Sequence, residues 1–146
     1  MHIEKCRPDQ IAQWTALRCA LWPDEDQEIM AREAPAMLTR PDALVLLARE
    51  GDAVTGFVEA ALRRDYVNGC ETSPVAFVEG IYVRPDYRGH GVARALIAAI
   101  EQWARAQNVK ELASDALLGN SQSHAMHQAL GFAETERVVY FRKALD

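Results

Sequence analysis

The chain has 146 residues, a length that suits one domain, residues 1–146, with a sizeable core. Hydrophobic residues make up 49% of it, which is too high for a disordered chain, and no apolar run reaches the roughly 18 residues of a membrane helix. The net charge of −5 disfavours a nucleic-acid partner and is compatible with a cationic one. Three cysteines without a Cys-x-x-Cys pair argue against structural zinc and indicate reduced thiols, hence a cytoplasmic protein.

Turn and cap residues separate the expected elements of the N-terminal half. Pro8 fits the first turn of a helix, and Asp24 is expected to cap a second helix whose first turn is acidic. The segment 65–74 is polar and is typical of a loop. In chain order we expect a strand, two helices and two strands, at His2–Cys6, Pro8–Leu21, Glu25–Leu38, Ala43–Arg49 and Val54–Arg63.

The C-terminal half predicts a β-α-β-α-β-β order. Asn120 is a candidate cap for the last helix, and Gly131 is a good stop for it. Together with the first half, this order favours an α/β protein with a mixed sheet and helices on both faces. The expected elements lie at Phe77–Val83, Val92–Gln107, Leu112–Leu117, Ser123–Leu130, Ala133–Arg137 and Val138–Arg142.

A glycine-containing turn joins the central apolar strand to the following helix. Pro85 ends the strand, and Gly89 and Gly91 allow the backbone to turn sharply and to approach a ligand closely. Free N–H groups at a helix start are suited to an anion such as phosphate. A Gly-x-Gly turn is also ordinary turn chemistry, and neither the dinucleotide fingerprint nor the P-loop is present.

Two motifs resemble the GNAT acetyltransferase superfamily. Arg-x-x-Gly-x-Ala, from Arg88 to Ala93, resembles the loop that holds the pyrophosphate of coenzyme A in that family. Asn120, Ser123, His127 and Gly131 keep the spacing of a second GNAT segment. Four longer stretches are similar to the bacterial aminoglycoside 6′-N-acetyltransferases of this superfamily; they cover residues 21–24, 77–83, 111–115 and 129–137.

The resemblance implies a GNAT-like, mostly antiparallel central sheet, acetyl-CoA as co-substrate, no metal and a homodimer. The strand before the glycine turn would pair with the pantetheine arm, backbone amides of the turn would hold the pyrophosphate, and an asparagine would contact the pantetheine region. The residues to which these coenzyme contacts carry over are Ile81, Tyr82, Val83, Arg88, Gly89, His90, Gly91, Val92, Ala93, Arg94 and Asn120.

Two acidic residues interrupt apolar strands and are candidates for chemistry. Glu79 lies in the middle of the central strand, and Asp115 lies in the next expected strand. A buried carboxylate needs a partner, a solvated cleft or a raised pKa. If the two strands are neighbours, both acids can face one cleft and help an ammonium to lose its proton. The alternative is that each is simply paired with an arginine.

Further candidate roles come from the resemblance and from single residues. His127 stands where the family often has a tyrosine that protonates the departing thiolate, and Tyr140 is a second candidate for that acid. His124 and His127 share a helix face, but without matched cysteines they do not indicate a metal site. The residues to which acceptor-binding roles carry over are Trp22, Glu25, Tyr66, Glu79, Asp115 and Glu136.

Three functions remain open at this point. The favoured one is acetyl transfer to the 6′-amine of aminoglycosides, which would give antibiotic resistance. The second is a GNAT enzyme for another amine, such as a polyamine, an amino acid or a protein N-terminus, because acidic positions suit any cation. The third is a non-catalytic module that keeps the coenzyme loop as a sensor.

Overall fold

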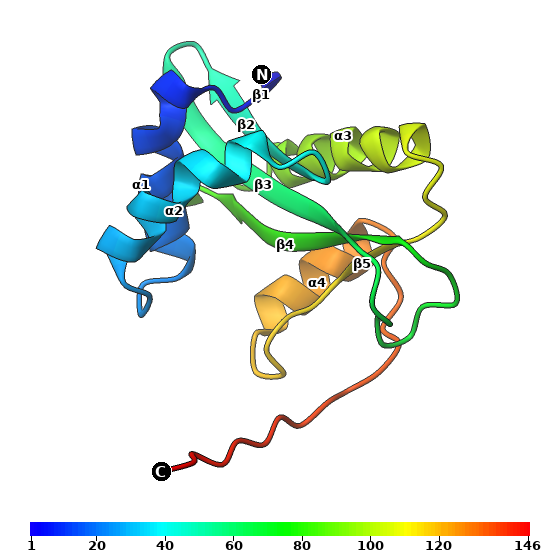
Figure 1. The fold of residues 1–146 in the computed structure, drawn as a ribbon. Coiled ribbons are helices and arrows are strands. Elements are labelled where there is room, and N and C mark those ends of the chain that lie inside the picture. Colours follow the sequence, from blue (N-terminus) through cyan, green and yellow to red (C-terminus); the bar gives the residue numbers. More distant parts are fainter.

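The computed structural model describes residues 1–146 and has a five-stranded sheet with the order β1-β2-β3-β4-β5 (Figure 1). Neighbouring strands are antiparallel except β4 and β5, which are parallel. The strands are β1 (His2–Lys5), β2 (Ala43–Glu50), β3 (Ala53–Arg63), β4 (Val75–Val83) and β5 (Leu112–Ser114). The helices are α1 (Ile11–Leu21), α2 (Gln27–Thr39), α3 (Val92–Ala106) and α4 (Ser121–Ala129), with short 3₁₀ turns at Pro8–Gln10 and Pro85–Tyr87.

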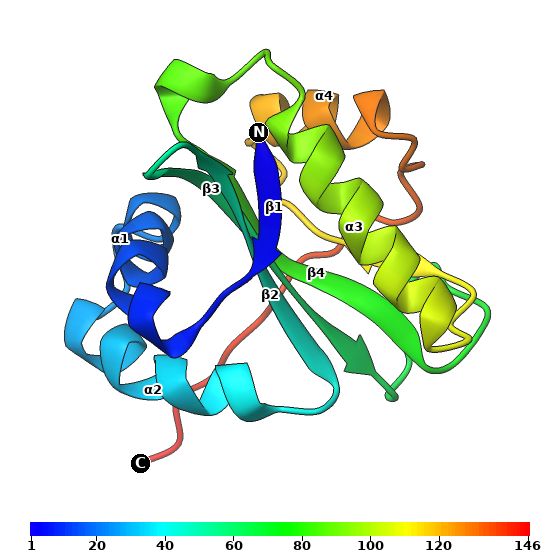
Figure 2. The ribbon, with the colours of Figure 1, turned by 90° about the horizontal axis from the view of Figure 1, so that it is seen from above.

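The helices cover both faces of the sheet, as the sequence predicted. Figure 2 shows α1 and α2 on one side of the strands and α3 on the other, with α4 beside the start of α3. None of the helices is long and apolar enough to cross a bilayer. Because helices cover both faces of the sheet, β3 is buried along almost its whole length, and β2 and β4 each contain a continuous buried stretch. These strands therefore appear in the sequence as apolar runs.

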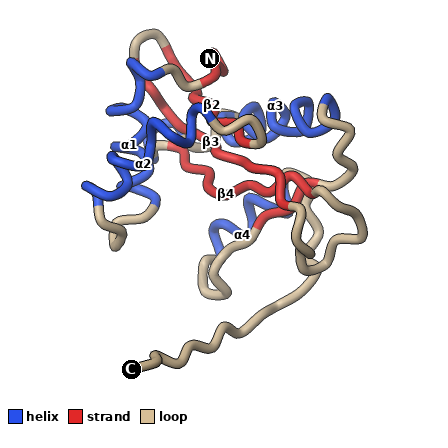
Figure 3. The backbone as a smooth tube through the Cα atoms, viewed as in Figure 1, coloured by secondary structure: helices blue, strands red, loops and turns tan.

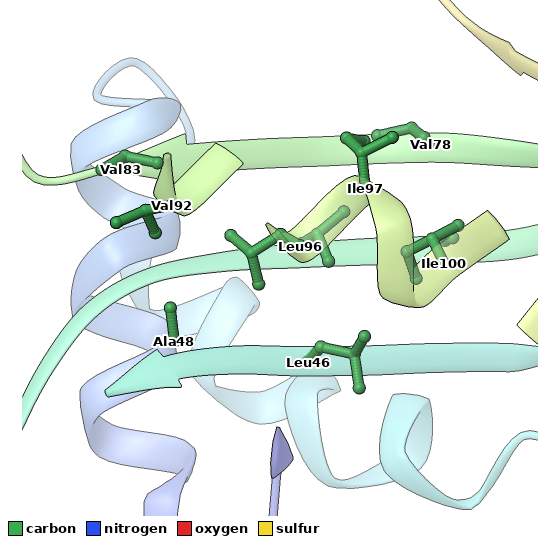
Figure 4. Close-up of a cluster of buried hydrophobic side chains, with 10 residues drawn as sticks. Leu46, Ala48, Val78, Val83, Val92, Leu96, Ile97 and Ile100 are labelled. Carbon is green, nitrogen blue, oxygen red and sulfur yellow. The ribbon is translucent and has the colours of Figure 1, made fainter. Parts of the chain in front are cut away.

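The face under α3 forms the larger of the two main cores. Val92, Leu96, Ile97 and Ile100 recur at helical spacing along α3 and are buried against β2, β3 and β4 (Figure 4). The opposite face packs Trp14 and other side chains of α1 and α2 against the same strands. The apolar periodicity of α3 fixes its orientation, so its N-terminus is held next to the end of β4.

The second helix begins two residues later than predicted. Asp26, not Asp24, caps α2 by accepting from the backbone N–H groups of Glu28 at 2.9 Å and Ile29 at 3.1 Å. The expected start at Glu25 is wrong because the N–H of Glu25 donates to the carbonyl of Trp22, closing a turn first. That turn places Trp22 beside the sheet.

The two closing strands expected at Ala133–Arg137 and Val138–Arg142 are not formed. Residues 132–146 contain no helix or strand, and the tail runs away from the body of the molecule (Figure 3). A strand persists only through hydrogen bonds to a neighbouring strand, and no segment of the chain lies beside the end of this tail. Its apolar side chains are consequently exposed, among them Val139, Tyr140, Phe141 and Leu145.

Candidate active site

The central strand β4 loses one of its neighbours halfway along its length. It pairs with β5 only over Ala76–Val78, whereas its pairing with β3 continues to Val83. From Glu79 to Val83 the backbone groups on the β5 side therefore have no strand partner. This free edge contains Ile81, Tyr82 and Val83, the residues expected to pair with an extended ligand arm.

A β-bulge lies at the point where the sheet opens. Glu59 of β3 pairs with Gly80, but its neighbour Ala60 pairs with Val78, so Glu79 is an extra residue in β4. A bulge bends its strand and changes the direction of a side chain. Here it turns the Glu79 carboxylate toward the face of the sheet that carries α1 and α2.

Glu79 is paired with an arginine, the alternative that the sequence left open. Arg63 Nε donates to Oε1 at 3.0 Å and Nη2 to Oε2 at 2.7 Å, a two-pronged contact. The guanidinium carbon lies 3.5 Å from the ring centroid of Phe77. Both partners are partly accessible, with 43% of the Arg63 and 33% of the Glu79 side chain exposed. The Glu79 carboxylate raises the pKa of Arg63.

Asp115 does not lie on a strand. The strand expected at Leu112–Leu117 ends at Ser114, because its pairing with β4 stops at Val78. Asp115 is therefore an exposed residue of the following loop. Its charge still acts on Arg63, whose pKa it helps to raise. Of the two predicted carboxylates, only Glu79 contacts Arg63, whereas Asp115 acts on it through charge alone.

The glycine turn has the conformation expected of an anion-binding helix start. Gly91 is the N-cap of α3, with φ of 81°, and Gly89 has φ of 79°. No side chain caps α3, so its first N–H groups are not satisfied by a cap residue. A Cβ on either glycine would contact nothing within 4 Å. The left-handed backbone, together with the need for close approach, accounts for glycine here.

The charged residues around this turn are tied to the protein itself. Arg88 Nε donates to the carbonyl of Val83 at 2.8 Å, and Arg94 Nη2 donates to the carbonyl of Ala129 at 3.1 Å. The first contact fixes the turn to the end of β4, and the second links α3 to α4. The side chain of His90 is exposed. Each guanidinium uses a single N–H group in these contacts, so the arginine side chains as well as the uncapped backbone amides of α3 keep donors for a phosphate.

The other predicted coenzyme residue, Asn120, has a structural role as well. Its side-chain oxygen accepts from the N–H of Ser123 at 3.1 Å and caps α4. His127 lies in the last turn of that helix, where its Nε2 is 2.7 Å from the hydroxyl of Ser114. The sequence did not single out Ser114, because a lone serine at a strand end carries no pattern.

A buried ion pair holds Trp22 in place on the face of α1. Arg18 Nε is 3.1 Å from Glu59 Oε2, which also accepts from the indole N–H of Trp14 at 3.1 Å. Burial raises the pKa of Glu59, although Arg18 opposes the shift. The guanidinium of Arg18 lies 5.3 Å from the Trp22 ring, which occupies the space where a Cβ on Gly80 would be. An aromatic wall therefore lies beside Glu79.

A shallow hollow of about 280 Å³ opens between α1 and α2 next to this wall. Beside the predicted Trp22 and Glu25, it is lined by Asp26 and Glu33, which the sequence did not assign to a site. A signal was available, because residues 26, 29, 30 and 33 share one face of a helix. The lining residues are Arg18, Trp22, Glu25, Asp26, Ile29, Met30 and Glu33.

Two predicted acceptor residues lie away from this hollow. Tyr66 is in the loop between β3 and β4, with 74% of its surface exposed. Glu136 was expected in a closing strand, but it lies in the exposed tail, which forms no strand. The tail does pass the same loop, since Thr135 fills the space beside Gly69. No group of three His, Cys, Asp or Glu side chains is placed to hold a metal ion.

The sequence is similar to a known family and to named bacterial enzymes. A family model described as the acetyltransferase (GNAT) family matches residues 6–132. The chain is 49% identical to the aminoglycoside N(6′)-acetyltransferase type 1 of Acinetobacter baumannii, with 98% of each chain covered. It is 50% identical to the protein of the same name from Serratia marcescens, over 96% of this chain and 97% of the relative.

Solved structures agree closely with the fold. The ligand-free aminoglycoside antibiotic 6′-N-acetyltransferase of Acinetobacter haemolyticus superposes with a TM-score of 0.95, at 45% identity and 100% coverage of both chains. AAC(6′)-Iy, in complex with the bisubstrate analogue CoA-S-monomethyl-acetylneamine, gives a TM-score of 0.93 at 39% identity, over 99% of this chain and 98% of that one.

Proposed function

The chain belongs to the GNAT acetyltransferase family, and we propose that it transfers the acetyl group of acetyl-CoA to the 6′-amine of aminoglycosides. The relatives that carry this activity in their names match 98% and 96% of the chain. The structural observation that best supports the acceptor is the Glu79 carboxylate, which stands at the opening of the sheet on the side of the acidic hollow.

The two substrates approach from opposite faces of the sheet. The start of α3, with its uncapped N–H groups, lies on one face and receives the coenzyme pyrophosphate. The free edge from Ile81 to Val83 pairs with the pantetheine arm as an added strand would. The acceptor enters from the α1 and α2 face, so amine and thioester meet in the gap between β4 and β5.

Glu79 is the group that assists removal of the proton from the amine. An ammonium must lose a proton before its nitrogen can attack the carbonyl carbon of the thioester, and a carboxylate can take that proton directly or through water. In the free protein Glu79 binds Arg63. The ammonium of the acceptor replaces this guanidinium, which is a small change in energy because the pair is partly solvated.

Other side chains position the antibiotic. Asp115 holds a neighbouring ring through its charge, and Trp22 and Tyr66 supply apolar walls. Glu25 and Glu136 make outer contacts. An aminoglycoside carries several ammonium groups, so several separate carboxylates recognise it better than they recognise a monoamine.

Thiol release is the direct test of this function. The protein is incubated with acetyl-CoA and either tobramycin or kanamycin. The free thiol released per molecule of antibiotic is measured, and the product is identified from its mass and its NMR spectrum. We expect one acetyl group, on the 6′-nitrogen. Turnover with a polyamine or a protein N-terminus but none with tobramycin would show that the acceptor is another amine. No turnover with any amine would indicate a binding module.

The exposed tail supports a homodimer. Tyr140, Phe141 and Leu145 are 85%, 92% and 88% exposed, an unusual degree of apolar exposure for a monomer. We expect light scattering to give a dimer for the full chain and a monomer for a chain that ends at Arg137. A full-length monomer at micromolar concentration would contradict this assembly.

Experiments in cells can test whether the activity gives antibiotic resistance. The three cysteines are free thiols, in keeping with a reducing compartment, and we propose the cytoplasm as the site of action. Expression in a susceptible bacterium should raise the inhibitory concentration of tobramycin, and a Glu79→Gln protein expressed at the same level should not. Equal protection by both proteins would show that resistance does not depend on Glu79.

A further inference from the structure

Both ring nitrogens of His127 already have partners in the protein. Nδ1 is 2.7 Å from the carbonyl oxygen of Ser123, and Nε2 is 2.7 Å from the hydroxyl of Ser114. The hydroxyl of Ser123 is also near Nδ1, but at the longer distance of 3.3 Å. Because a carbonyl can only accept, the 2.7 Å contact places the hydrogen on Nδ1, and in a neutral ring Nε2 accepts from Ser114. Neutral His127 therefore has no N–H group left for a third partner.

The imidazole ring is also held in its orientation. Phe132 packs edge-on against it, with ring centroids 5.2 Å apart and planes at 74°. The backbone N–H of Phe132 donates to the carbonyl of His127 at 3.0 Å, which fixes the turn after α4. The ring cannot turn toward a ligand without losing two hydrogen bonds, whereas the hydroxyl of Ser114 is free to rotate.

Ser114 stands where the sheet opens. It is the last residue of β5 and pairs with Val78, after which β4 has no neighbour on that side. Alternation along β5 places it on the same face as Leu112, which packs against the core under α3. The glycine turn that precedes α3 lies on this face as well, and both Ser114 and His127 are half-buried there. The residue that ends β5 at this gap is therefore also the hydrogen-bond partner of the imidazole.

We propose that Ser114 carries the proton from His127 to the departing thiolate of coenzyme A, a role that rests on the proposed acetyl transfer. When His127 is protonated, Nε2–H donates to Ser114 Oγ, and the serine proton is free to point into the gap. As the carbon–sulfur bond breaks, sulfur takes the serine proton and Ser114 takes the proton from Nε2. The amine nitrogen loses its proton toward Glu79 and solvent, and solvent protonates His127 again.

Three variants test the relay under single-turnover conditions. Ser114→Ala removes the hydroxyl and should lower the acetyl-transfer rate about 10²-fold, the lower end for loss of a general acid, with KM for both substrates unchanged. Ser114→Thr keeps a hydroxyl and should recover most of the rate. Ser121→Ala, which removes a hydroxyl from the exposed start of α4, is the matched control. A Ser114→Ala rate within twofold of wild type, or equal losses in the alanine and threonine proteins, would overturn the relay.

Two further readouts are independent of a folding defect. The rate in mixtures of H₂O and D₂O should show two protons in flight for the wild type and fewer for Ser114→Ala. Nitrogen NMR of the free protein should find neutral His127 protonated at Nδ1; protonation at Nε2 would overturn the assignment. Turnover of the wild type with tobramycin tests the acceptor, whereas the ratio of variant to wild type, measured with tobramycin or a simple diamine, tests the relay.

Discussion

Two carboxylate–arginine pairs stand on the same face of this sheet and have opposite environments. Arg18 and Glu59 are 10% and 4% exposed and are enclosed by two tryptophans. Arg63 and Glu79 are 43% and 33% exposed and lie at the gap between β4 and β5. Separating the buried pair leaves an uncompensated charge in the core, whereas the members of the exposed pair can exchange their partner for solvent or substrate. Burial therefore decides which pair supports the fold and which is available for chemistry.

The largest effect on activity is expected from the exposed pair. Glu79→Gln should lower kcat with tobramycin about 10²–10⁴-fold, the usual cost of losing a general base. The free energy of unfolding should change by less than about 1 kcal/mol, because the pair is solvated. Steady-state kinetics and urea unfolding measure the two quantities. A normal kcat in a folded Glu79→Gln protein would remove this carboxylate from the mechanism.

The largest effect on stability is expected from the buried pair. Glu59→Gln keeps the size of the side chain but leaves the Arg18 charge uncompensated, at a cost of about 3–5 kcal/mol in unfolding free energy. Urea unfolding gives this value, and Glu79→Gln is the matched control on the neighbouring strand. Equal and small losses in the two proteins would mean that burial does not distinguish the pairs.

The coenzyme turn should respond to its glycine. Gly91→Val places a branched side chain on a left-handed residue at the approach to the α3 amides, and we expect acetyl-CoA affinity to fall about tenfold or more. Gly51→Val is the control, because Gly51 also has positive φ, at 57°, but lies in the β2–β3 turn. Calorimetry on the folded proteins decides, and unchanged affinity in Gly91→Val would refute the pyrophosphate site.

The smallest effect is expected from Asp115. It is exposed, so its attraction for an ammonium is screened and is worth about 0.2–1 kcal/mol. Asp115→Asn should therefore raise KM for tobramycin a few-fold and leave kcat nearly unchanged. A fall in kcat comparable to that of Glu79→Gln would show that this loop residue takes part in the transition state.

The sequence predicted the features that depend on neighbours in the chain. The glycine turn before α3 and the Asn120 cap of α4 were both anticipated, because caps and turns are set by a few consecutive residues. The mixed sheet with helices on both faces followed from the order of elements. Acidic Glu79 was singled out because it interrupts an apolar strand.

Features that depend on distant partners were left open or missed, and the arginine that pairs with Glu79 could be offered only as an unnamed alternative. The Arg63 partner of Glu79 is 16 residues away and is brought into reach by a bulge, which apolar periodicity does not reveal. The strand carrying Asp115 was predicted too long, because its end is set by where β4 stops pairing. The closing strands at 133–142 have a strand-like sequence, but pairing requires a partner that this chain does not supply.

The exchange of partners at Glu79 can be observed directly through the two arginines. Side-chain Nε–H signals of Arg63 and Arg18 are followed by NMR while tobramycin is added to the protein with coenzyme A. We expect the Arg63 signal to shift to the position of a solvated guanidinium as Glu79 binds the 6′-ammonium, while the signal of Arg18 stays in place. Saturated tobramycin binding with an unchanged Arg63 signal would contradict the account.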